Sequence, residues 1–259
     1  MLSDFTPIVH HLDGRTIKVW AVADVHIGAR EALLSEWEAF LRKVEADPSS
    51  YLILDGDLLN NAVKSSCSDV YRETMAPSEA AEYAARVLQP VADRILAIVD
   101  GNHERRSSKE VDLSPLMLVS TMLHRSDGSN LLDVYRPNIA FIRIILGDAP
   151  RDTYAIMATH GKSQSRKRQF QSVVENVDAQ IYAHTHQPDV TMGPARLRLT
   201  NRNNIEVHDV VYLTACSWVQ AGGYSISGLY TPNAVARPQC LELEYTGTNS
   251  RKGRIKVVW

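Results

Sequence analysis

Cysteine is scarce in this sequence of 259 residues. The three cysteines, Cys67, Cys216 and Cys240, lie far apart and form no CxxC pair. An odd number of widely spaced thiols supports neither a disulfide framework nor a zinc ribbon. The sequence therefore favours a reducing compartment, and we expect a cytoplasmic protein.

Long hydrophobic runs are also missing. No apolar stretch approaches the ~20 residues that a membrane-spanning helix needs. Residues 1–15 lack the cationic start and the apolar stretch that identify a secretory signal. We therefore expect neither a membrane partner nor secretion.

The chain has no large excess of charge of either sign. Its net charge is −2, and hydrophobic residues make up 44% and charged residues 22% of it. This balance is typical of a globular protein and argues against a globally basic nucleic-acid binder, although a local basic patch is compatible with it. With no repeat, linker or low-complexity segment, residues 1–259 are predicted to form a single domain.

Short apolar runs alternate with helical patterns along the chain. A helix is predicted from Leu33 to the Asp47-Pro48 step, because its apolar residues recur at intervals of three and four. Two further helices are predicted at 78–89 and 166–177, and residues 60–77 are predicted to be a polar loop. Strands are predicted at 17–23, 51–54, 95–99, 140–146, 154–158, 179–183, 205–214, 239–245 and 254–258. The pattern indicates an α/β fold with a β-core and helices outside it.

Polar side chains follow five of these strands directly. They offer carboxylate, amide and imidazole ligands, with no thiolate among them, which suits Mn, Fe, Zn or Ni better than a purely oxygen-ligated Mg or Ca site. Ligand sites in open α/β sheets lie at such strand ends. Seven candidates exceed the needs of one tetrahedral ion, so two ions that share the two-oxygen carboxylate of Asp57 are expected. The candidates are Asp24, His26, Asp57, Asn102, His160, His184 and His186.

The motifs that carry these residues occur in a defined order, namely DVH (24–26), GDLLN (56–60), GNHE (101–104), THG (159–161) and AHTH (183–186). Together they resemble the calcineurin-like metallophosphoesterase family. Ala183 departs from the pattern, since the family usually has glycine there. The resemblance implies a four-layer α/β/β/α sandwich with a dinuclear metal site at the C-terminal ends of the strands, and it implies hydrolysis of phosphate esters.

The resemblance also assigns roles to individual positions. It implies two divalent metal ions, with Mn expected first and Fe, Zn, Ni or Mg as alternatives. His103 would be the catalytic histidine that faces the scissile phosphate, and Asn60 would support its loop. Glu104 is interpreted either as a partner that orients an imidazole or as a carboxylate that is solvated or caps a loop. Asp24, His26 and His186 would bind one ion, Asn102, His160 and His184 would bind the other, and Asp57 would bridge them.

Cations cluster directly after two of the strand ends, and these clusters indicate the class of substrate. Such positions suit contacts with backbone phosphates, although charge runs are also common on solvated helices and loops. We interpret the clusters as substrate-binding and predict a phosphodiesterase or nuclease that cleaves DNA by attack of a metal-bound hydroxide. The residues are Arg105 and Arg106 in one cluster, with Lys109 nearby, and Lys162, Arg166, Lys167 and Arg168 in the other.

Other functions are also compatible with the sequence. The first alternative is a phosphodiesterase or phosphatase of nucleotides or other small phosphoesters, and an alternative of another class is a non-catalytic metal-binding scaffold. A protein phosphatase is disfavoured, because Asn60-Asn61 stands where that branch has Asp-Arg. A companion subunit or a homo-oligomer stays open. The aromatic segment 217–238 has two interpretations, a substrate-facing loop or a packing segment.

Overall fold

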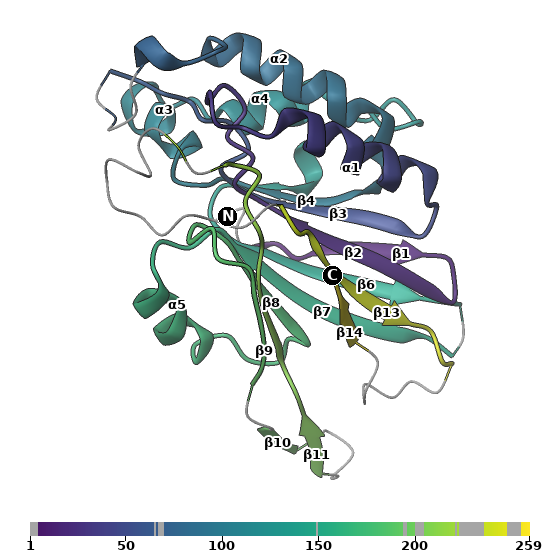
Figure 1. Ribbon diagram of the computed structural model, residues 1–259. Coiled ribbons are helices and arrows are strands. Elements are labelled where there is room, and N and C mark those ends of the chain that lie inside the picture. The colour runs from purple at the N-terminus through teal and green to yellow at the C-terminus, as the bar shows by residue number, and fades with distance from the viewer. Residues whose placement is uncertain are drawn as a thin grey trace.

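Two six-stranded sheets form the centre of the molecule, and helices pack outside them (Figure 1). The computed structural model describes residues 5–64, 66, 70–148, 150–193, 196–199, 205–220, 222, 236–247 and 255–259. Cys67 and most of the aromatic segment 217–238 therefore lie outside the described residues. The predicted α/β sandwich fold is confirmed. None of the helices within the described ranges is long and apolar enough to cross a membrane.

The first sheet has the strand order β14-β13-β2-β3-β4-β5. Its centre is parallel, with β2 (Thr16–Val22), β3 (Ser50–Asp55) and β4 (Ile95–Val99) side by side. β4 is buried along its whole length, as expected for a parallel strand covered on both faces. The two-residue β5 (Tyr135–Arg136) ends one side, and the antiparallel β13 (Gln239–Glu244) and β14 (Ile255–Val258) end the other.

Helices α1, α2 and α4 cover the outer face of this sheet (Figure 1). The predicted helices are confirmed as α1 (Leu34–Ala46) and α2 (Pro77–Leu88). α1 buries Trp37, Phe40, Leu41 and Val44, so the apolar periodicity identified the correct face. α2 buries four alanines and Leu88, and these small side chains let the helix pack closely against α4.

The sequence did not predict helices α3 (Glu104–Val111) and α4 (Pro115–Met122). α3 has the polar sequence ERRSSKEV, which contains no apolar periodicity to detect. α4 begins with a recognisable signal, because the Ser114 hydroxyl accepts a hydrogen bond from the backbone N–H of Met117 and proline occupies the first turn. Three short 3₁₀ turns, η2 (Val70–Arg72), η3 (Gln89–Arg94) and η4 (Leu132–Val134), complete the connections of this half.

The second sheet has the order β1-β6-β7-β8-β12-β9. The predicted strands are confirmed as β6 (Ala140–Leu146), β7 (Asp152–Thr159) and β8 (Ala179–Tyr182). β1 (Ile8–Leu12) and β9 (Asp189–Met192) were not predicted. The predicted strand 205–214 is wrong as a single element, because it divides into β11 (Ile205–His208) and β12 (Val211–Thr214).

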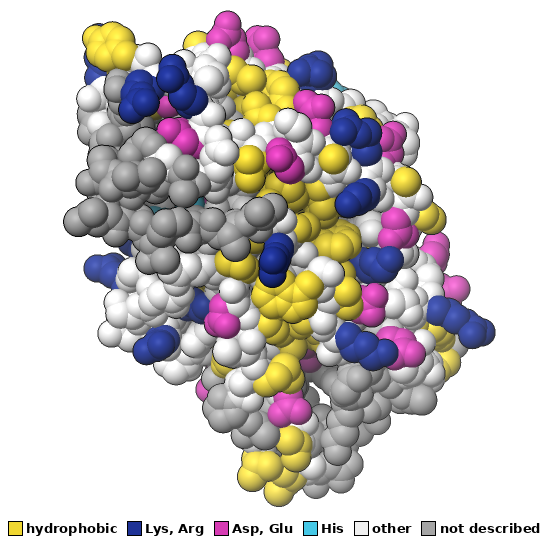
Figure 2. Space-filling view, viewed as in Figure 1, with side chains coloured by type: hydrophobic (Ala, Val, Ile, Leu, Met, Phe, Trp, Pro, Cys, Tyr) yellow, Lys and Arg dark blue, Asp and Glu magenta, His cyan; other side chains and the backbone are white. Residues whose placement is uncertain are grey.

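β10 (Arg196–Leu199) pairs with β11 as an antiparallel ribbon that projects from the body (Figure 1). Leu197 and Ile205 are 76% and 71% exposed, and apolar atoms are visible at this end of the molecule in the space-filling view (Figure 2). Elsewhere on the same face, cations and carboxylates are interspersed. This mixture agrees with the near-zero net charge of the chain.

The helix predicted at 166–177 is shorter than expected, since α5 spans Gln164–Gln171. Ser163 caps it by accepting a hydrogen bond from the backbone N–H of Arg166. Val174 and Val177 lie beyond the helix end, where they join a small apolar cluster with Met157 and Tyr182 of the second sheet. Their apolar spacing therefore reflects packing of an irregular segment on the sheet and not one face of a helix.

Candidate metal centre

Loops from both sheets converge where β2, β3, β4, β7 and β8 end. Many residues of these loops have left-handed backbone conformations, which are rare outside glycine and store about 1–3 kcal/mol of strain each. Such strain persists only where surrounding contacts hold the loops in place. The predicted ligands in this conformation, with φ between 48° and 70°, are Asp24, His26, Asp57, His184 and His186.

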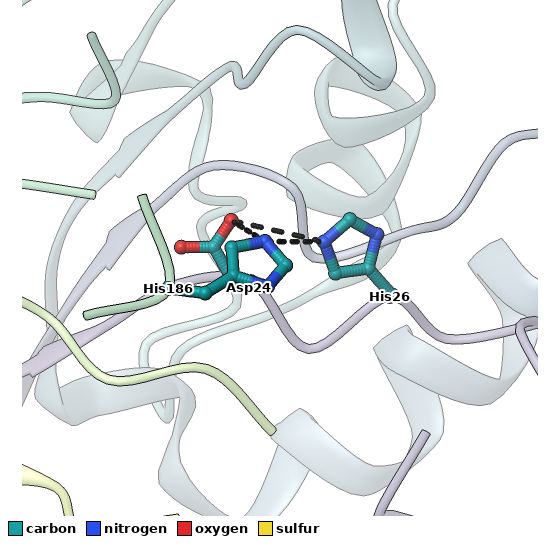
Figure 3. Close-up of side chains that lie close together, drawn as sticks. All are labelled: Asp24, His26 and His186. Carbon is teal, nitrogen blue, oxygen red and sulfur yellow. Dashed lines mark hydrogen bonds and ion pairs between the residues drawn. The ribbon is translucent and has the colours of Figure 1, made fainter. Parts of the chain in front are cut away.

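One cluster joins the end of β2 to the loop after β8. Asp24 Oδ1 lies 3.1 Å from His186 Nε2 and 3.7 Å from His26 Nε2, and the two imidazole nitrogens are 3.3 Å apart. Figure 3 shows the three side chains directed at one another. Two ligand atoms that each lie about 2.1 Å from an ion are at most about 4.2 Å apart. These distances are therefore compatible with one shared metal ion.

A second cluster lies beside the first and contains Asp57, His160 and His184, whose ligand atoms all lie within 4.8 Å of one another. Asp57 Oδ2 is 3.1 Å from His160 Nε2 and 3.7 Å from His103 Nε2. His160 Nε2 is also 3.8 Å from Asp24 Oδ1 of the first cluster. Because Asp57 also forms a close group with His26 and His103, its carboxylate lies between the two clusters.

Three buried atoms here make no well-aligned hydrogen bond within the described part of the chain, namely Asp24 Oδ1, Asn102 Oδ1 and His160 Nε2. Asp24 Oδ1 and His160 Nε2 make only ion-pair contacts, at 3.1 Å from His186 Nε2 and Asp57 Oδ2. Buried polar atoms nearly always have a partner, because burying one without it costs free energy. All three atoms are ligand types that first-row divalent cations accept. The residues at this site therefore fit a metal centre, and the amide oxygen of Asn102 is a further atom of a type that such a centre accepts.

Charge in the cluster is balanced only if protons or cations are present. Burial alone would raise the pKa of Asp57, but His160 and His103 beside it hold that pKa below its ordinary value. Burial alone would lower the pKa of His160, but the carboxylates of Asp57 and Asp24 raise it to about 10. Without a metal the imidazole thus carries the positive charge that the carboxylates require, and a divalent cation would displace that proton.

The imidazoles are oriented from behind by hydrogen bonds to their other nitrogens. His160 Nδ1 lies 2.7 Å from the carbonyl of Asp55, and His26 Nδ1 lies 3.2 Å from Asn60 Oδ1. The amide of Asn60 in turn donates to Glu73 at 2.6 Å. Such contacts direct Nε2 of each ring at the metal position. Asn60 thus orients the predicted ligand His26. Sequence reasoning missed Glu73, which lies in the polar loop 60–77 and holds the amide of Asn60.

Two glycines let the loops after β3 and β4 meet backbone to backbone. A Cβ on Gly56 would lie 2.4 Å from the backbone nitrogen of Gly101. A Cβ on Gly101 would lie 2.0 Å from Asp57 Oδ1 and 2.3 Å from the Asp57 nitrogen. No side chain fits these approaches. The glycines of GDLLN and GNHE are therefore required by the position of Asp57.

Glu104 is fully buried, so the solvated interpretation is wrong. Its carboxylate accepts hydrogen bonds from the backbone N–H groups of Gly101, Asp57 and Leu59 at 2.8–3.0 Å. It thus ties the loop after β3 to the start of α3, without contacting an imidazole. Burial, with the nearby charges of Asp57 and Asp100, raises the pKa of Glu104 to about 8.

His103 lies at the start of α3 beside the bridging position. Its backbone N–H donates to Asp57 Oδ1 at 2.8 Å, and its Nδ1 lies 2.7 Å from the carbonyl of Asn60. A carbonyl accepts only, so Nδ1 carries the proton and Nε2 of the neutral ring is an acceptor. Burial and the nearby His26 lower the pKa of His103 to about 3.

The predicted substrate-binding cations separate into different environments. Arg105 turns inward, and its Nη2 donates to the carbonyl of Asp100 at 2.7 Å. Arg106 lies beside His103, with 2.9 Å between its Nη2 and His103 Nε2. Lys167 is buried and donates to the hydroxyl of Thr214, so it anchors α5 against β12.

The remaining cations, Lys162, Arg166 and Arg168, are exposed on and before α5. Among the described residues they form no salt bridge, in contrast to Lys18, which pairs with Asp47 at 2.9 Å. Ala183, which replaces the usual glycine, is buried and does not belong to the residues with positive φ. Alanine therefore fits this turn without strain.

Comparison with known proteins gives a match over most of the chain. A family model described as calcineurin-like phosphoesterase matches residues 17–188. No curated protein matches the chain.

Solved structures that match the chain include a predicted phosphoesterase from Streptococcus pneumoniae, with 13% identity, coverage of 94% of this chain and 97% of the other, and a TM-score of 0.36. The calcineurin-like phosphoesterase YfkN from Bacillus subtilis has 13% identity, coverage of 94% and 88%, and a TM-score of 0.40. Zn-complexed Vps29 from Entamoeba histolytica has 13% identity, coverage of 93% and 97%, and a TM-score of 0.38. With TM-scores below 0.5, these similarities carry no argument about activity.

Proposed function

The chain belongs to the calcineurin-like phosphoesterase family, and from this membership we propose that it is a nuclease that cleaves phosphodiester bonds in DNA. Membership makes it a metal-dependent hydrolase of phosphate esters. The observation that carries the proposal of a DNA substrate is the exposed set of Lys162, Arg166 and Arg168, which follows the predicted ligand His160 in the chain. The substrate, the metals and the roles of single residues belong to the proposal.

The proposed centre holds two divalent cations, with Mn expected first. Asp24, His26 and His186 would bind one ion, and Asp57 would bridge the two. Asn102, His160 and His184 would bind the other. Support comes from the contacts of 3.1–3.8 Å among the ligand atoms. Further support is that buried Asp24 Oδ1, Asn102 Oδ1 and His160 Nε2 make no well-aligned hydrogen bond within the described residues.

Divalent cations bound there would neutralise phosphate oxygens and lower the pKa of a water molecule enough for it to attack at neutral pH. The chain's own contribution centres on His103. The carbonyl of Asn60 holds the proton on Nδ1, so Nε2 is directed at the substrate. An anionic phosphate near Nε2 favours protonation of that atom. We propose that this proton then passes to the leaving oxygen, a role worth about 10²–10⁴-fold in rate.

The basic residues around α5 would contact the DNA backbone. Their charges follow His160-Gly161 at the end of β7 and are not neutralised by salt bridges within the described residues. Each phosphate contact adds sequence-independent, salt-dependent affinity. A small phosphoester would use one or two such cations, whereas a polynucleotide would use the whole set. This is why we favour DNA over nucleotides as the substrate.

The test removes these charges without loosening α5. A variant with Lys162, Arg166 and Arg168 changed to Gln keeps the buried Lys167 anchor. We expect cleavage of duplex DNA to fall at least about tenfold with a shallower salt dependence. Hydrolysis of bis(p-nitrophenyl) phosphate should be unchanged. The matched control changes the exposed Arg15, Lys43 and Lys256 to Gln, which removes the same number of charges far from the centre, and it should cleave DNA normally.

Other outcomes favour the remaining candidates. Equal losses on both substrates would favour a small-phosphoester hydrolase. Absence of hydrolysis of every ester by the metal-loaded protein would favour a metal-binding scaffold. The free cysteines Cys216 and Cys240 support our proposal of a cytoplasmic location, which fractionation of cells that produce the protein would test.

A further inference from the structure

Arg106 shares a hydrogen-bond acceptor with His103. The backbone carbonyl of Asn60 lies 2.7 Å from His103 Nδ1 and 3.1 Å from Arg106 Nη1. One carbonyl has two lone pairs and can accept both bonds. The end of the GDLLN loop therefore positions the guanidinium and the imidazole as one unit.

The same two side chains also meet directly. Arg106 Nη2 lies 2.9 Å from His103 Nε2, the nitrogen that is directed at the metal centre. Residues three apart on a helix are neighbours, and Arg106 stands three positions after His103 at the start of α3. A guanidinium is thus held within hydrogen-bond distance of the atom that would face the scissile phosphate.

The segment that carries both side chains is firmly attached. Asn61 donates to the carbonyl of His103 at 2.8 Å and to the hydroxyl of Ser107 at 2.9 Å. The buried carboxylate of Glu104 holds the same turn from the other side. Arg106 therefore starts from a preorganised position, so less side-chain entropy is lost when it binds an anion.

The neighbouring Arg105 provides an internal contrast. Its guanidinium bonds the carbonyl of Asp100, at the end of β4, and its Nε is buried without a hydrogen-bond partner in the described structure. The two adjacent arginines thus differ in direction, one toward the sheet and one toward the centre. The sequence alone assigned them the same role.

We infer that Arg106 contacts the scissile phosphate group together with His103. When substrate binds, one guanidinium N–H of Arg106 exchanges its hydrogen-bond acceptor, from His103 Nε2 to a non-bridging phosphate oxygen. The inference rests on the proposed phosphoesterase function. Guanidinium is a strong donor to phosphate, and it stays charged at every working pH. The exchange also leaves Nε2 of His103 available to the substrate.

The test measures binding of inorganic phosphate to the Mn-loaded protein by isothermal titration calorimetry. We expect Arg106→Gln to weaken phosphate binding about 10- to 100-fold, as loss of a charge-assisted hydrogen bond does. Arg106→Lys should recover part of this loss, because it keeps the cation. Mn affinity should stay at the wild-type value in both variants. Lys43→Gln, an exposed change in the last turn of α1, is the matched control and should bind phosphate normally.

A second measurement, in protein that already carries His103→Ala, tests whether Arg106 touches the phosphate itself or only positions His103. In His103→Ala protein, Arg106→Gln should still weaken phosphate binding by a similar factor, because the guanidinium itself touches the anion. No further loss in that background would overturn the inference, as would wild-type phosphate affinity in Arg106→Gln or no phosphate binding by the wild type. The protein could also bind phosphate in a way that depends on Arg106 and yet hydrolyse no ester. That result would contradict the proposed function but support the contact between Arg106 and phosphate.

Discussion

Replacing Gly101 by alanine tests how closely the metal centre depends on the contact between two loops. The new Cβ would lie 2.0 Å from Asp57 Oδ1 and 2.3 Å from the Asp57 backbone nitrogen. The carboxylate could rotate, but the backbone nitrogen cannot, so the loop after β3 must move by about 1 Å to reach an ordinary contact. Gly101 is not among the glycines with positive φ, so the change adds contact without backbone strain.

The expected magnitudes follow from that displacement. Overpacking of this kind costs about 1–3 kcal/mol of folding free energy, which lowers Tm by roughly 2–4 °C per kcal/mol in chains of this size. The effect on metal should be larger. Metal ligands tolerate errors of about 0.2 Å, so a shift of Asp57 by several times that distance should weaken Mn binding by at least about 10–100-fold.

The assay compares thermal unfolding with and without Mn, and titrates Mn by calorimetry. Because a ligand that binds only the folded state raises Tm, the wild type should gain stability with Mn and Gly101→Ala should gain little. Gly128→Ala is the control, since Gly128 has a φ of +84° and no atom within 4 Å of its Cβ position. It should lose about 1–2 kcal/mol from strain and keep its Mn affinity. Wild-type Mn affinity in Gly101→Ala would refute the close-approach argument.

Two further predictions concern the groups behind the ligands. Because the pKa of Glu104 is raised from 4.5 to about 8, its stabilising contribution is fully present below about pH 4.5 and is lost as pH rises through 8. Metal-free protein should therefore lose stability over this range. The raised pKa of His160 adds to the loss above pH 6.5, so Glu104→Gln should reduce the slope in urea unfolding, whereas an unchanged slope contradicts the assignment. Asn60→Ala removes the acceptor at His26 Nδ1 and the donor to Glu73 but leaves the carbonyl that holds His103. It should weaken one of two Mn sites about tenfold or more in a two-site titration, and equal weakening of both sites, or of neither, would count against this relay.

The order of elements and the ligand types were predictable from local sequence. A short apolar run such as Ile95–Val99 followed by a polar cluster is a pattern of neighbouring residues, and each instance marked a real strand end. α3 was missed because its sequence contains no apolar period, and α5 was predicted too long because Val174 and Val177 pack on the sheet beyond its end. The spacing of apolar residues indicates which side chains are buried. Val174 and Val177 are buried without belonging to a helix.

The environments of the charged residues were not predictable. Arg105 and Arg106 are adjacent and chemically identical, yet one bonds Asp100 and the other meets His103. Lys167 belongs to the same basic run as Arg166 and Arg168 but is buried against Thr214. A helix turns by about 100° per residue, so neighbouring side chains on it face different surroundings, and only the packed structure shows which these are.

The sequence by itself determined the chemistry of this protein, because carboxylate, amide and imidazole groups placed directly after strands are set by residues next to one another in the chain. The tertiary structure decided how those groups meet. Asp24 and His186 are 162 positions apart but lie 3.1 Å from each other, since the two sheets pack with their strand ends at one edge. It also decided which carboxylate is buried, which arginine faces the centre and where glycine is indispensable, because each of these depends on atoms that come close only after both sheets have formed.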